Sequence, residues 1–150
     1  MNSCFDLGMQ FTWITILFLS IGSLFLEARI GETVEELQSR HGAGKEIGGN
    51  QIIFTIENFD VTITFDKGKS IREIYTTRVG NNNEVQPMNE KEVQRLLKIQ
   101  CEGKSWQKIE EESDGRTLWL MAEGTLYARF LPKFNTVTFT AALKELPRNR

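Results

Sequence analysis

The chain has 150 residues and the composition of one globular domain, with 40% hydrophobic and 25% charged residues. Its formal net charge is -2, and removal of residues 1–28 would lower the 20 acidic residues to 18, equal to the 18 basic ones. Such a neutral domain lacks the basic excess of nucleic-acid-binding proteins, so we expect no nucleic acid partner. It also gives no support to a polybasic membrane-surface domain.

Residues 11–26 form an apolar run without a charged side chain. The run is long for the core of a signal peptide and short for a membrane span of about 20 residues. We predict that residues 1–28 are a signal peptide cleaved near Ala28, which would export the domain to the periplasm or the medium. The alternative is an uncleaved membrane anchor through residues 11–26. Met9 offers a second start site that would remove Asp6 ahead of the run.

The segment from residue 31 to residue 42 predicts a short helix. Thr33 is the expected N-cap, and Glu36 stands three positions later, where it completes a capping box. Val34 and Leu37 are one turn apart and share a face. Gly42 supplies a residue that can adopt the left-handed conformation ending a helix. The same pattern returns at Asn89 and predicts a second helix over about residues 89–100.

Runs of alternating or β-branched residues follow each predicted helix and predict strands. They cover residues 51–57, 61–65, 106–110, 117–122, 125–130 and 136–141, with a further strand from about residue 69. Asp66–Gly68 predicts a three-residue hairpin that pairs Phe65 with Lys69. Residues 42–50 are expected to form a turn-rich connector. The short turns favour antiparallel pairing, because parallel strands need long crossovers.

Each predicted helix carries an apolar stripe of only two or three residues, so the two helices cannot form a core together. An antiparallel sheet with both short helices packed on one face solves this problem. We therefore predict an α+β fold for residues 29–150, as a single domain. It would consist of tandem helix–β-meander repeats, at about residues 29–86 and 87–143.

The spacing Gly31-x-Thr33-x-x-x-Leu37-x-x-x-x-Gly42, followed by strands, resembles the helix–β-meander unit of small outer-membrane assembly lipoproteins. Its tandem repetition resembles the secreted β-lactamase inhibitor proteins. The opening Arg-Ile-Gly-Glu-Thr from Arg29 is similar to that of small exported bacterial proteins that are uncharacterised. The chain departs from the lipoproteins in having Arg29 where they have a lipidated cysteine, and from the inhibitors in lacking a second mature cysteine. The resemblance implies an exported binding protein and carries no binding residue over.

Three features of the sequence are candidates for chemistry. His41 is the only histidine and is expected to cap the first helix, since a helix C-terminus favours such a side chain. Cys101 is the only cysteine after residue 28 and is expected to be a buried apolar side chain without an internal disulfide. The acidic residues 110–112 and Asp114 match no calcium loop and are expected to be a solvated turn. We predict no catalytic residue, no cofactor-binding residue and no metal ligand.

Alternation in residues 126–130 places Tyr127 and Arg129 on the side of the sheet away from the helices. Tyrosine and arginine are common anchors of protein interfaces, so these two residues are the predicted partner-binding site. The predicted function is binding of another envelope or secreted protein, without catalysis. The alternatives are an inhibitor of a secreted hydrolase and an enzyme built on carboxylates, which would need an acid whose pKa is raised. The oligomeric state is left open.

Overall fold

The computed structural model describes residues 29–79, 86–101 and 103–142. The predicted leader at residues 1–28 lies outside these residues. The helices are α1 (Val34–His41), α2 (Glu90–Gln100) and a short 3₁₀ turn, η1 (Pro132–Phe134). The strands are β1 (Lys45–Gly48), β2 (Gln51–Ile56), β3 (Phe59–Asp66), β4 (Lys69–Thr77), β5 (Trp106–Glu111), β6 (Thr117–Met121), β7 (Leu126–Leu131) and β8 (Thr136–Ala141).

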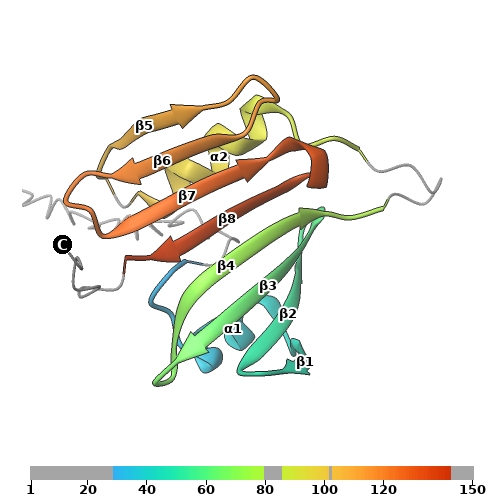
Figure 1. The fold of residues 1–150 in the computed structure, drawn as a ribbon. Coiled ribbons are helices and arrows are strands. Elements are labelled where there is room, and N and C mark those ends of the chain that lie inside the picture. The colour runs from blue at the N-terminus through green and yellow to red at the C-terminus, as the bar shows by residue number, and fades with distance from the viewer. Residues whose placement is uncertain (1–28, 80–85, 102, 143–150) are drawn as a thin grey trace, which may run out of the picture.

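The eight strands form one antiparallel sheet in the order β1-β2-β3-β4-β8-β7-β6-β5, which Figure 1 shows from bottom to top. The predicted α+β class with an antiparallel sheet is therefore confirmed. Along the chain, α1 precedes the meander β1 to β4, and α2 precedes the meander β5 to β8. The last strands of the two meanders, β4 and β8, pair with each other and close the sheet.

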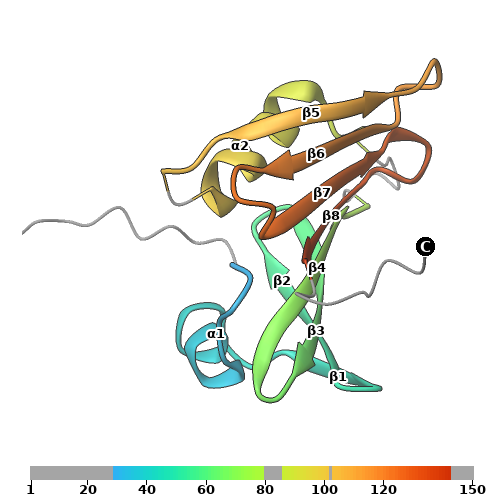
Figure 2. The same cartoon turned by 60° about the vertical axis from the view of Figure 1, so that its left-hand side comes forward.

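Both helices pack on the same side of the sheet. In α1, the His41 ring lies edge-on to Phe54 of β2 at 6.3 Å between ring centroids. In α2, Gln100 donates a hydrogen bond to Glu73 of β4. Phe54 and Glu73 share a face, because Phe54, Val61 and Tyr75 are paired across β2, β3 and β4 and Glu73 is two residues from Tyr75. Figures 1 and 2 show this arrangement, with the helices behind the sheet in the first view.

The helix ends follow the predicted caps. Thr33 accepts from the Glu36 backbone N–H at 3.2 Å, and the Glu36 carboxylate accepts from the Thr33 N–H at 2.8 Å. Asn89 and Glu92 repeat the same capping box at α2. Gly42 follows α1 with φ of 79°, a conformation that a side chain would strain.

The core is one cluster between sheet and helices. Leu37 of α1, Leu96 of α2 and Val61 of β3 are buried in it. The Trp106 indole N–H donates to the Leu97 carbonyl oxygen at 2.7 Å and so fastens β5 to α2. Burial of these stripes is the main favourable term for the fold, since neither helix is long enough to be stable in water alone.

Two local predictions were wrong. The predicted connector at residues 42–50 contains β1, an exposed edge strand paired with β2 through a bulge. The β3–β4 hairpin has a two-residue turn, Lys67-Gly68, with positive φ at both residues. Asp66 therefore pairs with Lys69 and Phe65 with Ser70, and a bulge follows before Thr64 pairs with Arg72.

Among the helices that the structure describes, none is long and apolar enough to cross a membrane.

Candidate functional site

The predicted site lies on the side of the sheet turned away from α1 and α2, called here the open face. On β7, Ala128 is fully buried beneath the helices, while Tyr127 is 42% exposed and Arg129 is also exposed. Phe130 packs against the core as the alternation predicts. The face assignment made for Tyr127 and Arg129 therefore agrees with the structure.

Strand pairing determines which residues surround these two. Tyr127 is opposite Leu120 of β6 on one side and Thr140 of β8 on the other. Thr140 in turn is opposite Arg72 of β4, so a tyrosine and an arginine flank one threonine. The next row across the open face contains Leu118, Arg129, Thr138 and Ile74.

Sequence reasoning missed part of this face. Thr136, Thr138 and Thr140 of β8 are half-buried beside Tyr127 and Arg129. Sequence reasoning did not expect the half-buried apolar side chains that lie between them. These are Leu118, Leu120 and Leu131. It also missed Arg72, because the strand order brings β4 next to β8 and no local pattern indicates that order.

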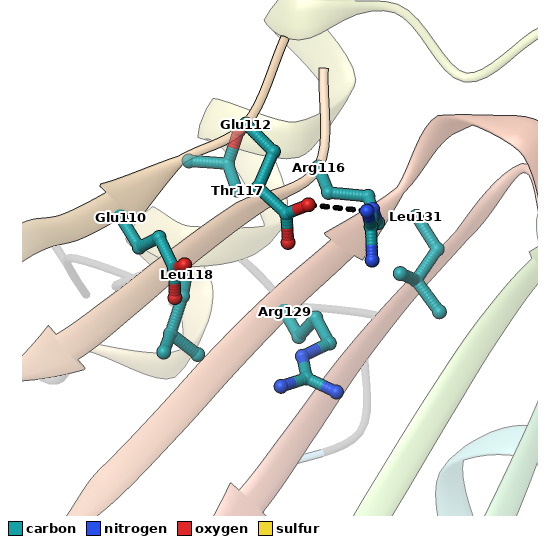
Figure 3. A pocket seen from close by; sticks show the side chains of 7 residues that line it. All are labelled: Glu110, Glu112, Arg116, Thr117, Leu118, Arg129 and Leu131. Carbon is teal, nitrogen blue, oxygen red and sulfur yellow. Dashed lines mark ion pairs between the residues drawn. The ribbon is translucent and has the colours of Figure 1, made fainter. Parts of the chain in front are cut away.

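A small hollow adjoins Arg129, and Figure 3 shows it from close by. Its volume is about 70 Å3, enough for a small group such as a carboxylate. In Figure 3, Arg129 lies between Leu118 and Leu131, and the Glu112–Arg116 ion pair lies along one side. The side chains that line it come from β5, β6, β7 and the β5–β6 turn: Glu110, Glu112, Arg116, Thr117, Leu118, Arg129 and Leu131.

The two arginines of this hollow differ in their surroundings. Arg116 is held by Glu112 and by Asp114, whose carboxylate accepts from the Arg116 Nε at 2.8 Å. Hydrogen bonds from the backbone and side chain of Arg116 lower the pKa of Asp114. Within the described part of the chain, no residue forms an ion pair or a hydrogen bond with the Arg129 guanidinium. Arg129 is therefore the cation of the hollow that an external carboxylate can contact.

A buried acid, Glu73, lies on the other side of the sheet. Its side chain is 0% exposed and sits between Ile63 and Phe139, its neighbours on β3 and β8. The Oε2 atom accepts from the Gln100 amide at 2.7 Å and from the Tyr75 hydroxyl at 3.3 Å. The Oε1 atom is buried without a hydrogen-bond partner among the described residues.

Burial raises the pKa of Glu73 to about 8, against the lowering effect of the Gln100 hydrogen bond. The charge of Glu32 also raises this pKa, and Arg40, which is ion-paired with Glu32, lowers it. Sequence reasoning missed this acid, although its alternation with Tyr75 on one strand was an available signal. Because the side chain is enclosed, it cannot contact a substrate.

The two other candidate residues have the positions but not all the properties that we predicted. His41 ends α1 as predicted, burial together with the charge of Arg40 lowers its pKa, and its ring lies edge-on to Phe54. Cys101 is half-buried rather than buried. Its thiol donates to the Lys98 carbonyl oxygen at 2.9 Å and lines a hollow of about 180 Å3.

The acidic turn contains ion pairs of its own, between Lys108 and Glu111 and between Arg116 and Glu112. Within the described part of the chain, no group of three or more His, Cys, Asp and Glu side chains is placed to hold a metal ion.

Comparison with known proteins adds little to this geometry. No family model matches the chain, and no curated protein matches it. Among solved structures, it is similar to a cysteine-rich secretory protein from Staphylococcus aureus subsp. aureus Mu50, at 12% identity with a TM-score of 0.41. The match covers 75% of this chain and 43% of that protein, so the chain spans less than half of its length. A likeness of this size carries no argument about function.

Proposed function

We propose that the protein is exported and acts without catalysis, by binding another protein of the cell envelope or the secreted fraction. The observation that carries this proposal is the open face, where Tyr127 and Arg129 stand among half-buried leucines and threonines. An aromatic ring and a guanidinium set among apolar side chains have the composition of an interface centre. Tyrosine offers a large contact area with few rotamers to freeze.

The order of the elements supports a tandem origin of the fold. Each helix is followed by four strands, both helices begin with a capping box, and the equivalent last strands β4 and β8 pair antiparallel. We propose that residues 29–86 and 87–143 are two repeats of the helix–β-meander unit. This proposal keeps the predicted resemblance to the assembly lipoproteins and the β-lactamase inhibitor proteins.

The alternative function, inhibition of a secreted hydrolase, would use the same face. An inhibitor would titrate an enzyme one to one, and this observation distinguishes it from an assembly factor. A carboxylate enzyme is less well supported. Glu73 has the raised pKa that such an enzyme needs, but its side chain is fully enclosed.

The binding proposal is tested with the Tyr127→Ala and Arg129→Ala double variant against a partner captured from the native envelope fraction. We expect binding to weaken by about 2 kcal/mol or more, the scale of interface hot spots. Stability should change by no more than about 0.5 kcal/mol, because both side chains are exposed. Equal affinity of the wild type and the variant would place the site elsewhere on the surface.

Export is tested by N-terminal sequencing of protein from the native host. We expect a mature chain that begins just after Ala28, because residues 11–26 are short for a membrane span. A chain that still begins at Met1 or Met9 and sediments with membranes would instead support the anchor.

A further inference from the structure

The centre of the open face carries positive charge that the domain itself does not neutralise. Nine outward positions of β4, β8 and β7 make up this centre: Arg72, Ile74, Thr76, Thr136, Thr138, Thr140, Tyr127, Arg129 and Leu131. They include two bases and no acid. Among the described residues, neither Arg72 nor Arg129 has an ion-pair or hydrogen-bond partner.

The acids of the neighbouring strands do not pair with the two arginines. Asp66 of β3 is two positions from Thr64, the residue opposite Arg72, and among the described residues it forms no ion pair with Arg72. Asp60 of β3 is occupied by Arg78 at 3.3 Å and by the Thr55 hydroxyl at 3.3 Å. Glu110 of β5 is two strands away from Arg129, across Leu118. At a strand spacing of about 4.8 Å, its Cα atom lies roughly 10 Å from that of Arg129. Neither arginine is therefore in contact with a carboxylate of the described residues, so each is free to pair with one from a partner.

Register also gives the spacing of the two arginines. Arg129 is opposite Thr138 and Arg72 is opposite Thr140, on the two sides of β8. Two strand spacings and two residues of rise put their Cα atoms roughly 12 Å apart. Tyr127 shares the Thr140 row, so an aromatic surface lies beside the two guanidinium groups.

We infer that the partner bound by the open face presents an acidic protein segment, with two carboxylates that pair with Arg72 and Arg129. This inference rests on the proposed function, because it assigns the chemistry of the partner at the same face. Guanidinium groups pair with carboxylates through two parallel hydrogen bonds, which gives direction as well as attraction. The half-buried Leu118 and Leu131 beside Arg129 reduce the access of water to that pair.

The probe is a fluorescein-labelled deca-glutamate peptide, titrated with the full domain at low ionic strength and followed by fluorescence anisotropy. The test variant is Arg72→Gln with Arg129→Gln. Its matched control is Lys91→Gln with Lys98→Gln, which removes two exposed positive charges from α2 on the other side of the sheet. We expect the affinity of the arginine variant for the peptide to fall about tenfold or more, because each lost arginine–carboxylate pair contributes up to about 1 kcal/mol. The lysine variant should keep the wild-type affinity.

Any one of three results would overturn the inference. The first is that the wild type fails to bind the peptide, and the second is that the lysine variant loses as much affinity as the arginine variant. The third is that a labelled DNA duplex binds more tightly than the peptide through the same arginines. The captured envelope partner separates this failure from that of the proposed function. If Tyr127→Ala abolishes partner binding and the arginine variant retains it, the face binds a partner that is not acidic there. If neither variant affects the partner, the binding face itself is wrong.

Discussion

Replacement of Glu73 by glutamine should remove most of the dependence of stability on pH. The carboxyl is fully buried, and its pKa rises from an ordinary 4.5 to about 8. Between these pH values the native state holds a proton that the unfolded state has released, so the free energy of unfolding falls as pH rises and is level above about pH 8. At about 1.4 kcal/mol per unit, the loss is on the order of 4 to 5 kcal/mol.

The Glu73→Gln variant lacks this titration. At about pH 9 it should be several kcal/mol more stable than the wild type, because no charge has to be buried. At about pH 5 the variant should be as stable as the wild type or less stable by about 1 kcal/mol, because the amide has two hydrogen-bond donors and the protonated carboxyl has one. The Oε1 atom, whose place the amide nitrogen would take, has no hydrogen-bond partner among the described residues.

The assay is urea unfolding of both proteins at a series of pH values, with the exposed Glu46→Gln as control. The wild type and the control should show the same falling stability, and Glu73→Gln should lack this fall and keep only the opposite, weaker trend that His41 contributes. The difference between wild type and variant isolates Glu73, because every other titration is common to both. Parallel profiles for wild type and Glu73→Gln would refute the assignment of Glu73 as a buried, protonated acid.

Three further predictions concern Thr33, His41 and Cys101. Thr33→Ala should lower the free energy of unfolding by about 1 kcal/mol through loss of the N-cap acceptor, and an unchanged denaturation midpoint would contradict the cap. An NMR titration should give His41 a pKa below 6.5, because burial disfavours its charged form. The contribution of the neutral ring to the free energy of unfolding is then lost as pH falls through the His41 pKa. A measured pKa above 6.5 would show that the helix dipole and Glu32 outweigh burial. Cys101 should react with a thiol reagent in the folded protein, more slowly than in urea, because it is half-buried, and Cys101→Ser should retain binding. No reaction before unfolding would mean that the thiol is closed off.

Local signals in the sequence were enough to place both helices and most strands. A capping box such as Thr33 with Glu36 satisfies backbone donors within one turn, so its effect is confined to neighbouring residues. Alternation along β7 likewise determined the faces of Tyr127 and Ala128, since successive side chains of a strand point to opposite sides. These features depend on residues a few positions apart, and the sequence alone predicts them.

Only the tertiary structure decided which strands are neighbours. The pairing of β4 with β8 joins segments more than 50 residues apart in the chain, and it alone brings Arg72 beside Tyr127. The same pairing encloses Glu73 between Ile63 and Phe139 and so creates the raised pKa. Register and order are set by burial of the whole inner face against both helices, a collective quantity that no short segment contains. The candidate charges and the buried acid therefore became visible only once the sheet was assembled.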